Sequence, residues 1–330
     1  MKFLSFFALP VLLFPLPLSA ADEPLFVFPA RCVLGQTCWT VNYVDVDQAE
    51  GKHADFTCAM KTEDEHKGTD FGLRSRGEMN AGVDVLAAAD GKVMRLRDGE
   101  NDSVKTEEEF EAIKEARKEC GNAVLIDHGN GLNTLYCHLK NGSLTVAIDE
   151  EVKAGQKIAQ VGQSGLSRFP HLHFGVVEGG AVIDPFTGET PAAGCGRFKR
   201  DYWQTVPAYE AVTVFDRGFS DKTPDFAAIR EGAAVPESLP ASGEGLVFWA
   251  GFYQLRAGDA IDLAITDASG QVFAARRIAV EENRVGPVYY YTGRQSGGAG
   301  TLPAGVYKGE IAYTRKGLDP YKITRSVVVE

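Results

Sequence analysis

The sequence predicts a mainly β protein: a compact antiparallel β-sheet domain with an inserted helix, followed by a β-sandwich domain of the Ig-like type. Two observations predict the sheet domain. Short β-type runs in the first half are punctuated by glycine, and a hairpin signal lies within residues 123–139. A third observation separates the two domains, because all six cysteines and all six histidines precede residue 200.

The hairpin signal consists of two β-type runs on either side of Asn130 and Gly131. This dipeptide best supplies the positive φ angles of a type I′ turn. With these two residues as the turn, His138 faces Ala123. Further strand and glycine-turn patterns occupy residues 83–93 and 152–162, which together predict a compact antiparallel sheet.

The inserted helix is predicted over residues 106–118. Thr106 and Glu109 have the spacing of a capping box, and basic residues stand at the C-terminal end of the segment. Its acidic residues are typical of a solvated helix face.

The C-terminal domain is predicted from short β-type runs that follow a Pro/Ala/Gly/Ser-rich linker at about residues 223–245. Short strands at such spacing favour a β-sandwich. Its aromatic residues are either sandwich core or a surface that stacks on sugars, and alternation along the strand favours the core. The predicted strands are 246–252, 260–266, 271–280, 287–292, 306–314 and 321–329, and the aromatic residues are Trp249, Phe252, Tyr289, Tyr290 and Tyr291.

The N-terminus predicts a secretory signal peptide at residues 1–20. Lys2 precedes an apolar run that ends in the small residues Ser19, Ala20 and Ala21. The run contains prolines and is shorter than the about 20 apolar residues of a membrane-spanning helix, so we expect no stable membrane insertion. Because one hydrophobic core rarely supports 330 residues, we expect domains at 21–200 and 201–330. A net charge of -11 without a Lys/Arg cluster argues against nucleic acid as a partner.

An even number of cysteines in an exported chain favours disulfides over reduced thiols. The six cysteines allow 15 pairings, of which Cys32 with Cys38 is the most local. In the predicted hairpin register Cys137 faces Val124. Cys120 precedes Val124 by four residues, which is about 13 Å at about 3.3 Å per residue. A bridge between Cys120 and Cys137 would therefore require the chain to bend back near Gly121.

Four polar residues gather in two short segments, His66 with Asp70 and His171 with His173. Residues two or four apart on a strand share a face, so two strands can present all four groups to one cleft. Two histidines and one aspartate meet the needs of a catalytic zinc, which takes three N/O ligands and keeps a fourth position for water. We predict that His66, Asp70 and His173 hold one zinc ion, although spacing alone allows either His171 or His173.

Three ordered motifs resemble the lysostaphin-like, or LytM-type, zinc metallopeptidases. They are His66-Lys67-Gly68-Thr69-Asp70, Tyr136-Cys137-His138-Leu139 and His171-Leu172-His173, within a core of residues 66–186. The resemblance implies zinc on His66, Asp70 and His173, with His138 and His171 as catalytic residues. A histidine that titrates near neutrality can take a proton from zinc-activated water, and a protonated imidazole can stabilise an oxyanion. His128 is expected to be a structural or rim residue, and His53 an exposed loop residue.

The resemblance also implies an exported zinc metalloendopeptidase that hydrolyses peptide bonds in peptidoglycan cross-links. We expect a monomer, periplasmic or secreted after signal-peptide cleavage, with peptidoglycan peptides as substrate. The alternative is a non-catalytic protein that binds cell wall or activates a partner hydrolase through its C-terminal domain. Residues 152–162 also resemble a turn of biotinyl or lipoyl carrier domains, but no lysine stands at the tip of a matching hairpin.

Overall fold

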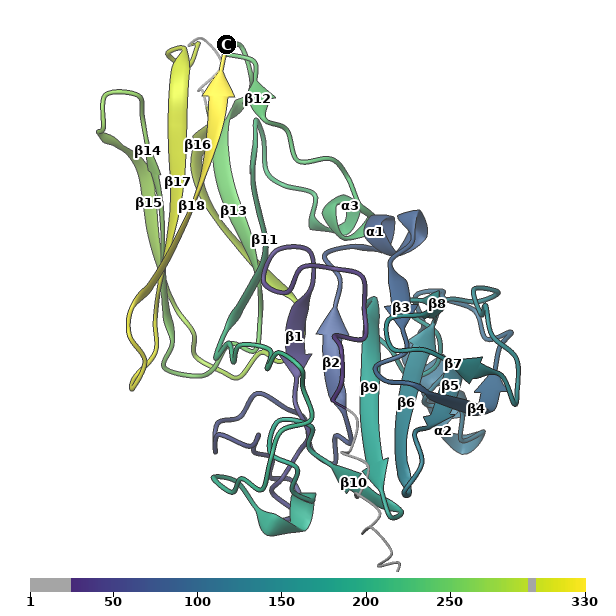
Figure 1. Ribbon diagram of the computed structural model, residues 1–330. Helices are drawn as coiled ribbons and strands as arrows, with labels where there is room; N and C mark the ends of the chain where they lie inside the picture. The colour runs from purple at the N-terminus through teal and green to yellow at the C-terminus, as the bar shows by residue number, and fades with distance from the viewer. Residues whose placement is uncertain (1–24, 296–300) are drawn as a thin grey trace, which may run out of the picture.

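A computed structural model describes residues 25–295 and 301–330 (Figure 1). The predicted signal peptide at residues 1–20 lies outside the described residues. The described chain is mainly β with antiparallel sheets, which confirms the predicted fold class. Within the described ranges, no helix is long and apolar enough to cross a membrane.

The first region is built on an eight-stranded sheet in the order β1-β2-β9-β6-β5-β4-β7, with β10 paired to β9 (Figure 1). A two-stranded sheet of β3 and β8 accompanies it. The strands are β1 (Trp39–Asn42), β2 (Thr69–Gly72), β3 (Asp84–Leu86), β4 (Gly91–Arg97), β5 (Asn122–Asp127), β6 (Leu132–Leu139), β7 (Glu151–Val152), β8 (Lys157–Gln160), β9 (His171–Glu178) and β10 (Ala181–Ile183), and the helices are α1 (Arg76–Ala81), α2 (Glu107–Glu115) and the 3₁₀ helix η1 (Pro191–Ala193).

Helix α2 confirms the predicted inserted helix, three residues shorter at its C-terminal end. The Thr106 hydroxyl accepts a hydrogen bond from the Glu109 backbone, and the Glu109 carboxylate accepts one from the Thr106 backbone. These reciprocal bonds satisfy two amide groups that a helix N-terminus otherwise leaves unpaired.

The predicted hairpin forms, but its register is wrong by one residue. Val124 faces Tyr136 rather than Cys137, because the turn is longer than the expected two residues. Gly129, Asn130 and Gly131 all have positive φ angles between the strands, so three left-handed residues make the turn instead of two.

The structure contains three disulfides among its described residues, Cys32–Cys38, Cys58–Cys195 and Cys120–Cys137. The last is possible because the chain turns at Gly121, whose φ is +59°. A Cβ on Gly121 would lie 2.4 Å from the backbone carbon of Ser164, so this turn accepts only glycine.

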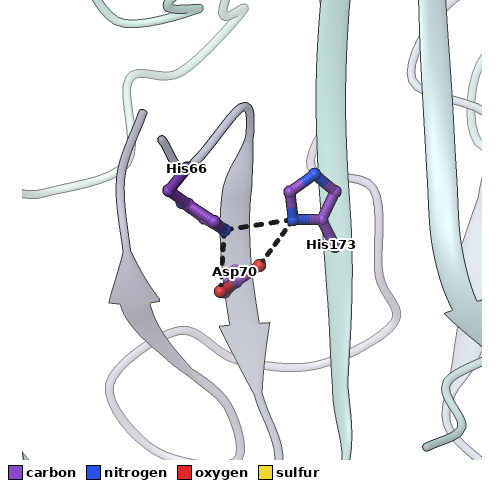
Figure 2. Close-up of side chains that lie close together, drawn as sticks. All are labelled: His66, Asp70 and His173. Carbon is purple, nitrogen blue, oxygen red and sulfur yellow. Dashed lines mark hydrogen bonds and ion pairs between the residues drawn. The ribbon is translucent and has the colours of Figure 1, made fainter. Parts of the chain in front are cut away.

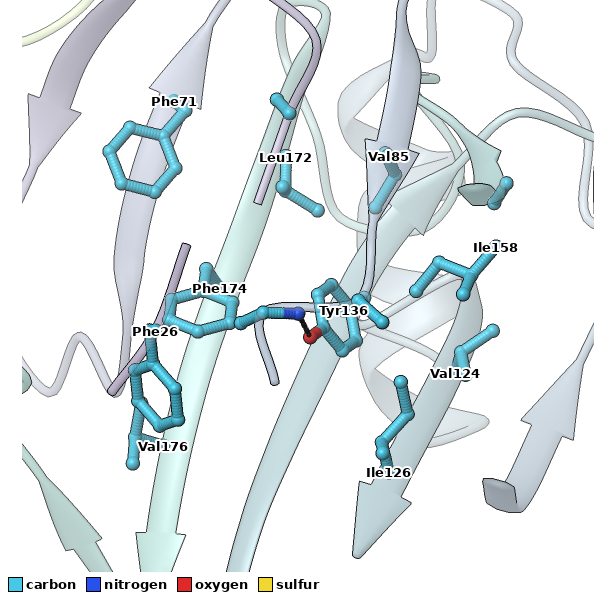
Figure 3. Packing of buried hydrophobic residues seen from close by; sticks show 14 of the residues in the cluster. Phe26, Phe71, Val85, Val124, Ile126, Tyr136, Ile158, Leu172, Phe174 and Val176 are labelled. Atoms are coloured by element: carbon cyan, nitrogen blue, oxygen red, sulfur yellow. Dashed lines mark hydrogen bonds between the residues drawn. The ribbon is translucent and has the colours of Figure 1, made fainter. Parts of the chain in front are cut away.

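The core of the first region packs between the two sheets (Figure 3). Tyr136 is fully buried there, and its phenolic oxygen accepts a hydrogen bond of 2.7 Å from the Ala88 backbone. Phe174 packs at 5.5 Å from the Tyr136 ring and edge-on to Phe26. These side chains fix β6 and β9 relative to each other, and the site residues lie on the same two strands.

The second region consists of a three-stranded sheet, β11-β13-β16, and a five-stranded sheet, β12-β18-β17-β14-β15. Both sheets contribute to one hydrophobic core, while the Ig-like class stays a prediction. The elements are β11 (Thr213–Ser220), α3 (Phe226–Glu231), β12 (Ser238–Leu239), β13 (Gly245–Tyr253), β14 (Ala260–Thr266), β15 (Val272–Ala279), β16 (Val288–Gln295), β17 (Gly305–Thr314) and β18 (Tyr321–Val329).

All six predicted C-terminal strands are present, and the segment predicted as a linker, at about residues 223–245, contains short secondary structure. That segment contains α3 and β12, and β11 precedes it as part of the second region. The side chains of Trp249 and Phe252 are buried, so they belong to the core and present no stacking surface. Tyr291 is 37% exposed and remains a surface residue.

The two regions meet at an interface with apolar and polar parts. Trp39 of β1 packs in one cluster with Phe215 of β11 and Tyr253 of β13. Beside this cluster the buried ammonium of Lys61 donates a hydrogen bond of 2.9 Å to the Thr213 hydroxyl. The first region is thus held against the sheet that contains β11 and β13.

Candidate metal centre and active site

Asp70 and His173 are direct partners in the pairing of β2 with β9. The prediction that His66 shares a strand with Asp70 is wrong, because β2 begins at Thr69 and His66 lies in the preceding loop. Glu65 has a left-handed backbone, with φ of 60°, and turns the chain just before His66. His66 therefore reaches Asp70 from a loop and not from strand alternation.

The three predicted ligands converge (Figure 2). His66 Nε2 lies 3.0 Å from Asp70 Oδ2 and 3.1 Å from His173 Nδ1, and His173 Nδ1 lies 2.9 Å from Asp70 Oδ1. One ligating atom from each residue lies within 4.8 Å of the other two. Of the two histidines on β9, it is His173 that joins this group.

Neighbouring groups hold the three side chains in place. His66 Nδ1 lies 2.7 Å from the Tyr43 carbonyl and donates to it, which leaves Nε2 free to ligate. The amide of Asn42 donates a hydrogen bond of 2.9 Å to Asp70 Oδ2. A Cβ on Gly68 would lie 2.5 Å from His173 Nε2, so glycine is required between His66 and Asp70. Two imidazole nitrogens and a carboxylate fit one zinc ion, and His66 and Asp70 each have an outer hydrogen-bond partner.

The electrostatics of the cluster favour an ionised aspartate. Burial works against charge on Asp70, but His66 and His171, with the hydrogen bond from His173, hold its pKa well below the usual value. Burial alone would lower the pKa of His66, whereas the charge and hydrogen bond of Asp70 raise it to about 9. A metal ion must displace that proton, because histidine ligates in its neutral form.

His138 and His171 lie beside the cluster, with their ring centroids 4.5 Å apart. His138 Nδ1 lies 2.8 Å from the Ser164 carbonyl, and His171 Nδ1 lies 2.9 Å from the Phe169 carbonyl. Both rings therefore donate from Nδ1 to a backbone carbonyl, which fixes the tautomer with Nε2 unprotonated when the ring is neutral. His171 Nε2 is 3.6 Å from Asp70 Oδ1.

His138 owes its position to a β-bulge at the end of β6. The pairing of β5 with β6 shifts between Asn122 and Val124, and His138 has a left-handed φ of 57°. Such strained backbone is enriched at functional sites. Burial, followed by the nearby His171 and His173, lowers the pKa of His138 well below its usual value. His138 is therefore neutral at physiological pH and can accept a proton.

The two remaining histidines lie outside this group. His128 bonds through Nδ1 to the Asp90 carbonyl and through Nε2 to the Thr134 hydroxyl, at 2.7 and 2.8 Å. This agrees with a structural role. His53 is half-buried with its Nε2 inaccessible to solvent, so the expectation of an exposed residue is wrong.

Sequence reasoning missed the groups that support the ligands, including Tyr43 and Asn42. Asn42 in turn accepts a hydrogen bond from the side chain of Gln254, which belongs to the second region. No sequence spacing points to these residues, because they are brought to the site by the pairing of β1 with β2 and by contact between the regions.

The segment that contains the candidate site is similar to a known protein family. Residues 64–185 match peptidase family M23. We refer to the matched segment, residues 64–185, as the M23 domain. All five predicted site residues fall inside it. Asn42 and Gln254 lie outside the matched residues.

Relatives of the M23 domain include cell-wall enzymes. A peptidoglycan DD-endopeptidase of Vibrio cholerae, ShyB, is 30% identical over 128 residues, which cover 39% of this chain and 24% of that protein. A DD-carboxypeptidase/endopeptidase of Neisseria meningitidis, Mpg, is 39% identical over 71 residues, covering 22% of this chain and 16% of that protein. The chain thus spans about a quarter or less of the length of these relatives.

Among solved structures, the catalytic domain of the prophage-encoded M23 protein EnpA from Enterococcus faecalis is 22% identical. The match covers 51% of this chain and 98% of that domain, with a TM-score of 0.32. The catalytic domain of lysostaphin from Staphylococcus simulans is 23% identical, with a TM-score of 0.28, and the match covers 44% of this chain and 86% of that domain.

Proposed function

We propose that this chain is an exported zinc metalloendopeptidase that hydrolyses peptide bonds in peptidoglycan cross-links. The observation that carries the proposal is the convergence of five residues. Three ligating atoms lie within 4.8 Å of one another, and two further histidines stand beside them with rings 4.5 Å apart. The M23 match supports peptidase chemistry, and the names of the relatives support the cell-wall substrate. Three disulfides support an oxidising, extracytoplasmic location, periplasmic or secreted.

In this proposal His66, Asp70 and His173 hold one zinc ion, which supplies Lewis-acid activation of water and of the scissile carbonyl. His138 and His171 are the catalytic residues that move protons. His138 accepts a proton at Nε2, because its lowered pKa leaves the ring neutral and its Nδ1 proton is committed to the Ser164 carbonyl. His171 anchors its Nδ1 proton in the same way and presents Nε2 toward the cluster. The structure favours neither histidine as the sole general base.

The experiment is digestion of purified peptidoglycan sacculi by the mature protein loaded with zinc, with products identified by mass. We expect cross-linked muropeptides to be cut at amide bonds, and the Asp70→Ala variant to release nothing. A non-catalytic cell-wall binder would instead co-sediment with sacculi and release no fragment. Finding that the parent and Asp70→Ala proteins give the same products would refute the assignment of the cluster.

A further inference from the structure

A cavity of about 440 Å³ lies between the M23 domain and the second region. Its volume is in the range of about 300–1,000 Å³ that ligand sites occupy. Phe169 and Pro170, which precede β9, line it together with Tyr253 and Tyr289 of the second region. The rings of Phe169 and Tyr253 pack 5.0 Å apart and form one aromatic wall. The Phe169 ring also lies 4.6 Å from the His171 ring. The cavity therefore shares a wall with the candidate active site.

Two buried hydrogen-bond donors on the cavity lining lack an acceptor. Arg74 Nε and the hydroxyl of Tyr289 are inaccessible to solvent and have no hydrogen-bond partner within the described residues. The carboxylates nearest to Arg74 Nε are Glu78, at 3.5 Å, and Asp216, at 3.9 Å, which exceeds a good N–H···O distance. These two atoms are therefore out of reach of a ligand in the cavity, which would be bound by the exposed groups of the lining.

The charge of the lining favours an anionic ligand. Four arginines and one glutamate line the cavity of a protein whose net charge is -11. Arg76 is paired with Glu231 at 3.2 Å, and Arg168 with Glu107 at 2.6 Å. Arg230 is exposed and has no ion pair to any residue that the structure describes. Its guanidinium is the group available to a carboxylate.

The cavity is preformed by close contact between α1 and α3. A Cβ on Gly77 would lie 2.8 Å from Gly232 Cα, and a Cβ on Gly232 would lie 2.6 Å from Gly77 Cα. Backbone contact at these glycines fixes α3, which carries Arg230, against the M23 domain. A rigid site loses little conformational entropy when a ligand binds.

We propose that this cavity binds a carboxylate-bearing part of a peptide substrate, next to the bond that is cut. The inference rests on the proposed function, because it places an anionic peptide at the same active site. Arg230, an exposed arginine of the lining, pairs with the carboxylate. The aromatic wall of Phe169 and Tyr253 contacts the apolar parts of the peptide.

The test compares two synthetic tetrapeptides, one with a glutamate side chain and a free C-terminal carboxylate, the other with glutamine and a carboxamide. Binding to the metal-depleted full chain is measured by calorimetry. We expect the acidic peptide to bind the parent at least about tenfold more tightly, which a single well-formed ion pair can supply. Arg230→Ala should abolish this preference.

The matched control is Arg277→Ala, which removes an exposed arginine of β15 that pairs with Asp262 outside the cavity. It should retain the preference of the parent. Equal affinity of the parent for both peptides, or equal loss in Arg230→Ala and Arg277→Ala, overturns the inference. If the zinc-loaded protein releases no fragment from sacculi but the peptide preference still depends on Arg230, the proposed function fails while the binding site remains.

A second inference rests on a different observation, a buried hydrogen-bond chain from the second region to a metal ligand. Arg256 donates to Gln254 Oε1 at 2.8 Å, Gln254 donates to Asn42, and Asn42 donates to Asp70 at 2.9 Å. The side chains of all four residues are buried. Gln254 has a left-handed backbone, with φ of 60°, at the end of β13. A non-glycine residue tolerates that conformation only when its surroundings impose it.

We infer that Gln254 is a positioning residue for the metal centre. By holding the Asn42 amide toward Asp70, it fixes the orientation of the carboxylate that ligates the metal. Loss of comparable outer partners costs about 10–100-fold in metal affinity in other proteins. The second region would thereby contribute to metal binding without contacting the metal.

The test is Gln254→Met, which keeps most of the side-chain volume but removes the donor. Zinc affinity is measured by chelator competition and the geometry by the absorption spectrum of the cobalt-loaded protein. We expect an affinity loss of about 10–100-fold and a shifted cobalt spectrum. The control, Thr292→Val, removes a buried hydroxyl of β16 that is not part of the chain. Parent-like affinity and spectrum in Gln254→Met, or an equal change in the control, would show a merely structural role.

Discussion

The M23 domain and the second region differ in chemistry more than in architecture. Both are antiparallel β structures with their own hydrophobic cores. Every histidine and every cysteine of the chain lies before residue 200, whereas the second region has no residue of either type. Among the residues that the structure describes, the second region reaches the site through Gln254 and the shared cavity. The histidines are thus all in the first region, and we expect the second region to act by positioning them or the substrate.

The largest expected effect is loss of the metal centre in His66→Ala. The variant leaves two ligands, so we expect zinc to be lost at micromolar protein and hydrolysis to fall by more than the about 100-fold that removal of an outer partner costs. Zinc content measured by mass spectrometry, together with muropeptide release, checks this. His53→Ala is the matched histidine control and should retain one zinc per chain.

The next largest effect is expected in His138→Ala, a variant that separates metal binding from proton transfer within the M23 domain. In His138→Ala the three ligating side chains are intact, so zinc should remain, while kcat should fall by about 10²–10⁴-fold because a positioned acid–base group is lost. Steady-state kinetics with a defined muropeptide gives kcat. Zinc loss equal to that of His66→Ala would mean that His138 belongs to the metal centre instead.

Local sequence patterns predicted the elements of both regions better than the contacts between them. In β14 and β17 buried residues alternate with more exposed ones, as apolar residues alternate with polar ones in the sequence. Such strands can be predicted without knowing which strands they pair with. The hairpin register was wrong because Gly129 extends the turn beyond the Asn-Gly dipeptide. Helix α3 was missed because its surroundings are rich in turn-forming residues, and its stability comes from contact with α1.

In the candidate site, too, local sequence patterns predicted the residues better than the contacts that position them. His66, Asp70 and His173 were chosen from motif spacing, and the structure brings them together. The reason given for His66, a shared strand face, was wrong, because a loop delivers it. The position of His138 depends on a bulge and a left-handed residue, which follow from long-range pairing and cannot be read from local sequence.

The two regions also differ in disulfides, because all three disulfides among the described residues lie in the first region. Cys58–Cys195 closes a separation of 137 residues in the first region, just outside the two ends of the M23 domain. Replacing both cysteines by serine should lower the free energy of unfolding of that domain by roughly 2–5 kcal/mol, since the unfolded chain regains conformational entropy. Calorimetry should show the transition of the M23 domain moving to lower temperature. A single transition that shifts as a whole would indicate that the two regions unfold together.

Buried carboxyl groups occur in both regions and give a pH-dependent comparison. Burial raises the pKa of Asp184, which follows β10, to about 7, and that of Asp216, on β11, to about 6. The folded protein therefore keeps these protons at a pH where the unfolded chain has released them. Unfolding releases protons between about pH 4 and the folded pKa, so each group makes stability fall as the pH rises through that window.

Asp184→Asn should remove the contribution of Asp184 to the pH dependence of the free energy of unfolding. Asp184 is fully buried, and Oδ2 has no hydrogen-bond partner in the described chain. Between pH 4 and 7 the parent should lose roughly 3–4 kcal/mol more stability than the variant, at about 1.4 kcal/mol per pKa unit. Asp216→Asn should remove the pH dependence of the free energy of unfolding over a narrower range, which ends near pH 6. Urea unfolding at several pH values measures both, and identical pH profiles for parent and Asp184→Asn would show that the Asp184 carboxylate is already ionised and solvated in the folded domain.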